Sequence, residues 1–182
     1  TYYQYGQVSV TLVGGLGGDK LTVSDANAGN AGSYGYGVAW ANLSGGDGAD
    51  VLSVSGVSQA TLSGGAGADT FVLNAQQYRT ELQGARTFSN ADGTSTLVDA
   101  GPVVITDFVT GAGQDVLDVS DLLKNVASSF DGSNPFTSGY LKLQQSGADT
   151  QVVFDADGTA GLTKSGVVIA VLQNVNAADL VA

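Results

Sequence analysis

A nine-residue pattern that occurs three times in the first half of the chain constrains the fold more than any other feature. It reads Gly-Gly-x-Gly-x-Asp-x-U-x, where U is a large apolar residue, and its copies begin at Gly14, Gly45 and Gly64. Glycine enters backbone conformations that other residues avoid, so glycines at positions one, two and four let successive carbonyl oxygens turn toward one point. The pattern predicts a tight turn followed by a short strand whose large apolar residue fills the interior.

Such a turn offers the ligands of a hard cation, because a ring of carbonyl oxygens surrounds one carboxylate. Calcium takes 6 to 8 oxygen ligands at about 2.3 to 2.6 Å and tolerates irregular geometry, whereas magnesium requires a tight octahedron and zinc prefers nitrogen or sulfur. The chain contains no His and no Cys, which leaves softer metals few ligands. A set of ordinary β-turns is the alternative, but it does not explain the glycine at position four. We therefore expect calcium.

The spacing of the copies predicts how the turns are arranged. Gly45 and Gly64 lie 19 residues apart, close to two nonapeptides, which is one coil of a two-sided parallel β-roll. Stacked coils lie about 4.8 Å apart, so Asp50 and Asp69 would repel each other unless a cation lay between them. The opposite turn, residues 55–60, lacks the glycines and the aspartate, so one edge is expected to bind calcium well and the other poorly. The expected fold is all-β: a right-handed parallel β-roll capped by a short helix and a small antiparallel C-terminal region.

Charge and composition exclude several classes of function. The 182 residues include 17 acidic and 6 basic ones, for a net charge of −11, which argues against binding to nucleic acid or anionic lipid. The absence of His, of Cys and of a Gly-x-Ser-x-Gly elbow argues against catalysis within these residues. No apolar run approaches the roughly 20 residues that span a bilayer. The chain begins at Thr1 without Met and is expected to be part of a longer, monomeric protein.

Three parts are expected along the chain. Residues 1–73 form the repeat region with an inserted loop at 25–37, residues 74–102 an irregular or helical insertion with a flexible loop at 89–96, and residues 103–182 the C-terminal region.

The C-terminal region carries its own expected elements. Ser120 or Asp121 can cap a short helix that carries Leu122 and Leu123 inward. Antiparallel strands are expected at 140–143, 151–154 and 167–172. Residues 155–158 resemble the start of an EF-hand loop, but the third oxygen ligand and the later glutamate are missing, so a β-turn is expected there.

The ordered set of motifs resembles the C-terminal end of RTX (repeats-in-toxin) proteins, whose calcium-binding repeat is this nonapeptide. The resemblance also rests on residues 105–108 followed by 115–123, and on 153–158 followed by 171–175. This order is similar to the type I secretion target domain of large bacterial surface adhesins. The resemblance implies an uncleaved signal in 177–182 that the ABC transporter complex of a type I system reads, and a secreted or cell-surface location in a Gram-negative bacterium.

The resemblance further implies the calcium ligands. They are the carboxylates of Asp19, Asp50 and Asp69 with backbone carbonyls of their turns, while Asp47 is an extra ligand and Asp107 helps to close the last coil. The full set of expected metal-site residues is Gly15, Gly17, Asp19, Gly45, Gly46, Asp47, Gly48, Ala49, Asp50, Gly64, Ala66, Ala68, Asp69 and Asp107. The number of ions stays open, because good turns are few and two insertions interrupt them.

The leading functional expectation is a domain that stays unfolded inside the cell and folds on calcium outside it, so that folding is coupled to secretion. Two alternatives remain. One is a calcium-dependent sugar-binding module that uses Tyr34, Tyr36 and Trp40 of the inserted loop, although packing on the flank is the simpler role for these aromatics. The other is the C-terminal roll of a secreted protease or lipase.

Overall fold

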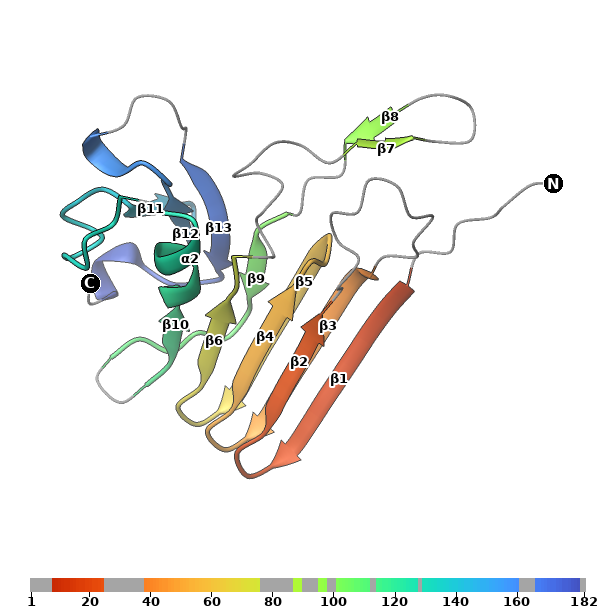
Figure 1. Cartoon of the computed structure of the whole chain (residues 1–182). Coiled ribbons are helices and arrows are strands. Elements are labelled where there is room, and N and C mark those ends of the chain that lie inside the picture. The colour runs from red at the N-terminus through yellow and green to blue at the C-terminus, as the bar shows by residue number, and fades with distance from the viewer. Residues whose placement is uncertain are drawn as a thin grey trace.

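Strands dominate the structure and build three sheets of seven, four and two strands (Figure 1). The computed structural model describes residues 8–24, 38–75, 87–89, 95–97, 101–111, 114–127, 129–160 and 166–180. The strands are β1 (Val8–Leu16), β2 (Lys20–Ser24), β3 (Val38–Asp47), β4 (Val51–Ser55), β5 (Gln59–Ala66), β6 (Thr70–Leu73), β7 (Thr87–Ser89), β8 (Ser95–Leu97), β9 (Val103–Ile105), β10 (Val116–Asp118), β11 (Leu141–Ser146), β12 (Asp149–Phe154) and β13 (Val167–Leu172). Short helices are α2 (Ser120–Asn125), η1 (Gly158–Ala160) and η2 (Ala177–Asp179).

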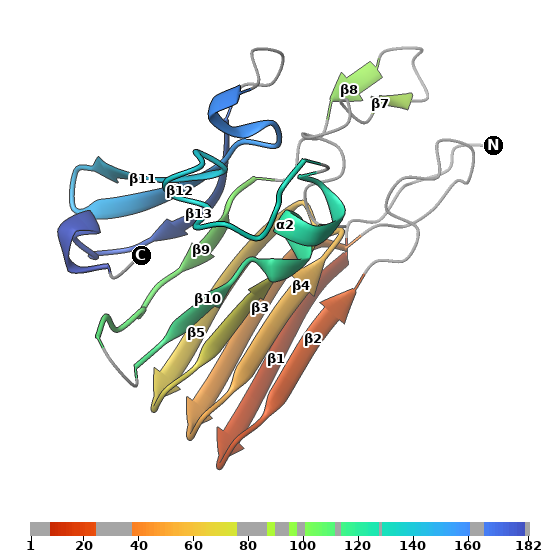
Figure 2. The ribbon, with the colours of Figure 1, turned by 60° about the vertical axis from the view of Figure 1, so that its left-hand side comes forward.

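The first strands alternate between the two larger sheets. β1, β3, β5 and β9 pair in parallel in the seven-stranded sheet, and β2, β4, β6 and β10 pair in parallel in the four-stranded sheet. Tight turns join the layers at one end, as Figure 2 shows for β1 to β2, β3 to β4 and β5 to β6. The apolar residue of the second and third nonapeptides, Leu52 and Phe71, is fully buried. Burial of these side chains, together with others such as Leu62 of β5 and Leu73 of β6, helps to hold the layers together.

The seven-stranded sheet is mixed, and this corrects the expected fold. Its order is β1-β3-β5-β9-β13-β12-β11. The three expected C-terminal strands exist and pair antiparallel with one another, but β13 also pairs in parallel with β9. They therefore extend the sheet. The prediction of a right-handed parallel β-roll closed by a separate small antiparallel cap is wrong.

The physical reason for this difference lies at the edge that β9 would expose. An unpaired strand edge presents free N–H and C=O groups, and a strand with apolar side chains can satisfy them. Ile169, Ala170 and Leu172 of β13 are almost completely buried. A tandem repeat in sequence indicates only its own parallel pairings, so the pairing of β9 with β13 is not visible in the repeat.

The short helix α2 lies where it was expected, but its predicted cap is wrong. Leu122 is fully buried and Leu123 partly buried against the core. Ser120 and Asp121 are the first two residues of the helix, and the Ser120 N–H donates to Asp118 Oδ1 at 2.9 Å. Asp121 instead accepts a hydrogen bond from the backbone just after β6, with an N–Oδ2 distance of 2.7 Å. This contact ties the helix to the four-stranded sheet.

The two expected insertions, at residues 25–37 and 74–102, lie largely outside the described residues. The inserted loop expected at 25–37 lies outside the described residues, and so do its Tyr34 and Tyr36. The same holds for the helical stretch expected within 75–82, of which only Ala75 is described. Trp40 belongs to β3 and not to a loop, which corrects its predicted position. The expected flexible loop at 89–96 includes the ends of β7 and β8, which pair antiparallel. Within the described ranges, no helix has the length and apolar character that crossing a membrane requires.

Candidate metal centre

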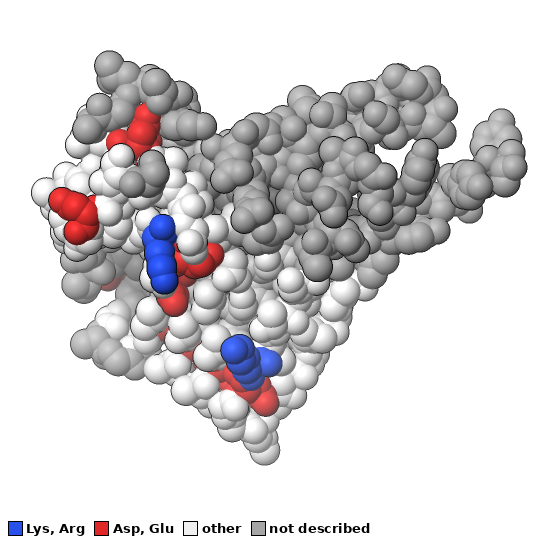
Figure 3. All heavy atoms as spheres, in the orientation of Figure 1, with Lys and Arg blue, Asp and Glu red and all other residues white. Residues whose placement is uncertain are grey.

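The turns that follow β1, β3 and β5 lie side by side on one edge of the molecule. The pairing register aligns Gly15 with Gly46 and Gly46 with Gly65. The Gly17 N–H donates to the Asp47 carbonyl at 2.7 Å, and the N–H of the next fourth-position glycine makes the equivalent bond, also at 2.7 Å. In Figure 3, acidic atoms gather near this edge beside a basic side chain. The three nonapeptides therefore form one stack of turns, as their spacing predicts.

A ladder of aspartate side chains holds neighbouring turns together. The backbone N–H of Asp19 donates to Asp50 Oδ1 at 2.7 Å, and that of Asp50 donates to Asp69 Oδ1 at 2.8 Å. The ladder continues from the N–H of Asp69 to Asp115 Oδ1 at 2.9 Å. Charge-assisted hydrogen bonds of this kind are stronger than neutral ones. One oxygen of each carboxylate is thus used to set the spacing of the stack.

The second oxygen of two of these carboxylates has no partner. Asp50 and Asp69 are each only 1% exposed, and no hydrogen bond reaches their Oδ2 atoms. A buried charged oxygen without a partner costs free energy, of the order of 1 to 3 kcal/mol or more. Each such group calls for a compensating charge or donor, and a bound ion is one common explanation.

The glycines at position one show where an ion would lie. A Cβ built on Gly45 would collide with Asp50 Oδ2 and would stand 2.5 Å from the Gly64 carbonyl oxygen. A Cβ on Gly14 would meet Asp19 Oδ2 at 2.5 Å and would also collide with the Gly45 carbonyl oxygen. A carboxylate oxygen and the carbonyl oxygen of the next turn therefore converge on the same small space. Hard oxygen donors around a space left open by glycine fit calcium.

The structure places the expected metal-site residues in these three turns, with Asp107 as the exception. Asp107 follows β9, and its Oδ2 accepts hydrogen bonds from Ser63 Oγ at 2.7 Å and from the Gly65 N–H at 2.9 Å. Its Oδ1 accepts from the Gly64 N–H at 3.0 Å. Asp47 has an exposed side chain at the tip of the second turn. Asp107 therefore fastens the third turn through hydrogen bonds made by both oxygens.

Sequence reasoning missed Asp115, which ends the aspartate ladder. Both of its oxygens accept hydrogen bonds, Oδ1 from Asp69 and Oδ2 from the Val109 N–H at 2.8 Å. A signal for it exists, because residues 110–118 read Thr-Gly-Ala-Gly-Gln-Asp-Val-Leu-Asp, a nonapeptide with threonine at position one. A search that allows threonine there would have found this fourth copy.

The electrostatics of the stack favour a bound cation. The pKa of Asp69 is raised, chiefly by burial and also by the negative charges of Asp115, Asp50 and Asp107, although the hydrogen bond from the Asp50 backbone opposes the rise. A divalent cation would supply the missing positive charge. Among the described residues, no three His, Cys, Asp or Glu side chains lie close enough to hold a metal by themselves. Backbone carbonyls would have to complete the ligand set.

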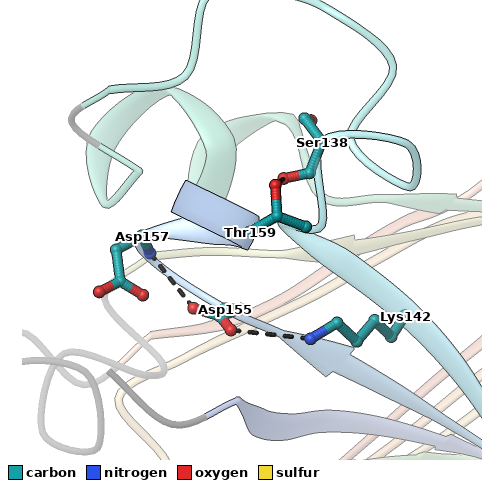
Figure 4. Close-up of polar contacts among 5 residues, drawn as sticks. All are labelled: Ser138, Lys142, Asp155, Asp157 and Thr159. Carbon is teal, nitrogen blue, oxygen red and sulfur yellow. Dashed lines mark hydrogen bonds and ion pairs between the residues drawn. The ribbon is translucent and has the colours of Figure 1, made fainter. Parts of the chain in front are cut away.

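A second acidic cluster lies after β12 and has a different character (Figure 4). Asp155 is 8% exposed, its Oδ2 lies 3.8 Å from Lys142 Nζ, and its Oδ1 accepts from the Asp157 N–H at 3.3 Å. The chain turns here and enters η1, which fits the expected turn. Burial, followed by the interaction with Asp157, raises the pKa of Asp155, while Lys142 opposes the rise. Because Asp155 already lies within ion-pair distance of Lys142, we assign no metal to this cluster.

Replacing Asp155 with Asn is expected to stabilise the fold at pH 7 and to have little effect near pH 4. The folded-state pKa of Asp155 lies above its unfolded value, so its favourable contribution is complete at low pH and is lost as pH rises through the folded pKa. Asn mimics the protonated acid at every pH, so the gain is expected to grow from pH 4 to pH 7, where the natural side chain is charged. Urea unfolding of both proteins between pH 4 and 7 measures the difference. A gain that grows on acidification would contradict this sign.

The fold and the turns define a class of site: stacked glycine-rich turns whose buried carboxylates and converging carbonyls suit a hard divalent cation. Neither a scan against protein-family models nor a search of curated proteins found a match to this chain.

Proposed function

We propose that this chain is a calcium-binding domain that folds when calcium fills its stacked turns. The observation that supports this most directly is the pair of buried Oδ2 atoms of Asp50 and Asp69, which have no hydrogen-bond partner. The Gly64 carbonyl oxygen converges on the space beside Asp50 Oδ2. Asp19, Asp50 and Asp69 would provide the carboxylates, and their turns the carbonyl oxygens.

The energetics allow such a domain to sense the difference between the inside and the outside of a cell. Extracellular calcium modules have dissociation constants of about 10⁻⁴ to 10⁻³ M. At free calcium tenfold above such a constant, each site would stabilise the fold by about 1.4 kcal/mol, and three sites by roughly 4 kcal/mol. At calcium far below the constant this contribution disappears. A domain whose calcium-loaded fold is stable by less than this amount would then unfold.

We further propose that the domain is the C-terminal, type I secretion region of an RTX protein. Its motifs resemble those at the end of large surface adhesins. The support is the order of motifs in sequence: nonapeptides first, then residues 105–123, then 153–175. In this proposal the transporter complex exports the unfolded chain, and external calcium starts folding at the turns. No catalysis is assigned to these residues.

Calcium titration of the chelated chain, followed by far-ultraviolet circular dichroism, tests this proposal. A cooperative gain of β signal at about 0.1 to 1 mM calcium is expected, whereas magnesium at the same concentrations is expected to give little change, because the open, irregular turns suit the larger ion. A spectrum that is already β-rich in chelator and does not change with calcium would refute folding on calcium.

One observation favours a second candidate, a sugar-binding module. Trp40 is 41% exposed on β3, and its indole N–H donates to Gln59 Oε1 at 2.9 Å, which holds the ring in place. Exposed aromatic rings are common platforms for apolar ligand faces. A glycan array with the isolated domain, with and without calcium, separates this candidate from the first. Calcium-dependent glycan binding that Trp40→Ala removes would favour the module.

A further inference from the structure

The C-terminal segment that follows β13 is folded back onto the β11–β12 hairpin. Thr150 of β12 is completely buried, and its Oγ1 donates to the Val175 carbonyl at 2.7 Å. Gln145 of β11 accepts from the Ala177 N–H at 2.8 Å through Oε1. Val175 is 5% exposed and Leu180 packs against the core. Figure 2 shows this last part of the chain beside the C-terminal strands. The segment is therefore docked by hydrogen bonds and by two apolar anchors.

The turn that sends the segment back is specific. Asn174 has a φ of +55°, a left-handed conformation that is uncommon outside glycine. Its backbone N–H donates to Asp149 Oδ1 at 2.9 Å. Asn176 then starts η2 by accepting a hydrogen bond from the Ala178 N–H at 3.0 Å. These contacts fix one path for residues 173–180.

A short series of contacts connects the docked segment with the third turn. The Gln173 N–H donates to the Ile105 carbonyl at 2.9 Å, at the end of the pairing between β13 and β9. Ile105 is aligned with Leu62 of β5. Asp107, two residues later, holds Gly64 and its neighbours through its three hydrogen bonds. The third turn and the C-terminal segment therefore depend on the same strand, β9.

We propose that calcium binding at the stacked turns also docks residues 173–180 against β11 and β12, so that this segment is exposed only in the calcium-free chain. The inference rests on the proposed function, since it requires calcium to bind at the turns. It adds a regulatory consequence: a partner that reads the C-terminus as an extended peptide meets it before calcium binds and not afterwards. β13 pairs with β12 over five residues and with β9 over three, and its buried Ile169 and Leu172 belong to the same core as Val103 and Ile105 of β9. The C-terminal strands therefore reach their full burial only when β9, and β5 beside it, are in place.

Carboxypeptidase Y serves as the probe, because it requires a free and extended C-terminus. The full chain is digested in chelator and in 10 mM calcium, and release of Leu180 is followed by mass spectrometry. Calcium is expected to slow this release about tenfold or more, in step with the calcium dependence of the circular dichroism signal. Isothermal titration calorimetry measures calcium binding separately on the same samples.

The variant Gln145→Ala separates docking from folding in general. It removes the contact with Ala177 and also the Nε2 hydrogen bonds to the carbonyls of Val175, Gly147 and Asp149. Gln145 contacts none of the three glycine-rich turns, so calcium binding is expected to stay within about twofold while release of Leu180 in calcium becomes nearly as fast as in chelator. Gln144→Ala is the matched control, because Gln144 is an exposed neighbour on the same strand. If Gln145→Ala does not fold, Thr150→Val tests the same docking contact, because it removes the hydroxyl that donates to the Val175 carbonyl.

The outcomes distinguish the two proposals. Slow release in calcium for the natural chain and for Gln144→Ala, with fast release for Gln145→Ala, supports docking. Calcium binding without any change in the release of Leu180, or equal protection in Gln145→Ala, overturns the docking inference and leaves the proposed function intact. Absence of calcium binding overturns both.

Discussion

Gly45→Ala is expected to remove the calcium response of the Asp50 site, about 1.4 kcal/mol, whereas Gly15→Ala is expected to preserve it. Neither glycine has a positive φ, so the backbone accepts alanine at both positions. At position 45 the added methyl group would collide with Asp50 Oδ2 and fill the space beside the Gly64 carbonyl. At position 15 it would meet no atom within 4 Å. Comparing the two variants therefore separates the effect of filling the proposed ion site from the general effect of replacing glycine with alanine.

Two free-energy changes are expected for Gly45→Ala, one in the calcium-free fold and one in the stabilisation by calcium. Overpacking at position 45 is expected to destabilise the calcium-free fold by about 1 to 3 kcal/mol. The methyl group meets Asp50 Oδ2 and the Gly64 carbonyl, so one site is affected, and calcium tenfold above its dissociation constant would contribute about 1.4 kcal/mol less. Urea unfolding in calcium, and in chelator with sucrose added to favour the calcium-free fold, measures both quantities. A calcium gain equal to that of Gly15→Ala would show that no ion occupies this space.

Asp69→Asn is expected to raise the stability of the fold in chelator and to lower it in calcium. In chelator the variant is more stable than the natural chain at pH 7, because burial and three neighbouring carboxylates raise the pKa of Asp69 and disfavour its charge. Asn keeps an oxygen for the Asp50 N–H, so the ladder survives. A gain of about 1 kcal/mol in chelator is expected from removing the buried charge. In calcium the variant is less stable, because the cation loses a charged ligand.

The measurement is urea unfolding of both proteins at pH 7 with 10 mM calcium, and with chelator in the presence of sucrose, which favours the folded state of the calcium-free chain. Acidification provides a second check: in chelator the folded-state pKa of Asp69 lies above the unfolded one, so the natural chain becomes relatively more stable as pH falls through the folded value. Asp131→Asn, at an exposed position outside the turns, is the control and is expected to show no calcium-dependent change of sign. Equal destabilisation of Asp69→Asn in both conditions would assign Asp69 a structural role only.

The candidate site was largely predictable because its signals are local. The glycines at Gly45 and Gly64 and the aspartates five residues later belong to one short turn each, and the structure aligns these turns on one edge. Asp115 was missed because threonine replaces the first glycine of its copy. The three hydrogen bonds of Asp107 were not predictable, since they depend on β9 lying beside β5.

The amino-acid sequence by itself determined the tight turns, their common edge and the buried apolar residue of the second and third repeats, because each depends on backbone freedom and on a repeat length that is visible along the chain. Only the tertiary structure decided that the sheet is mixed, that Asp50 and Asp69 each keep one oxygen without a partner, and that the C-terminal segment docks on Gln145 and Thr150. These features arise where strands distant in sequence compete for the same edge. Such competition is settled by main-chain hydrogen bonds and burial between segments, and neither leaves a local pattern in the residues involved.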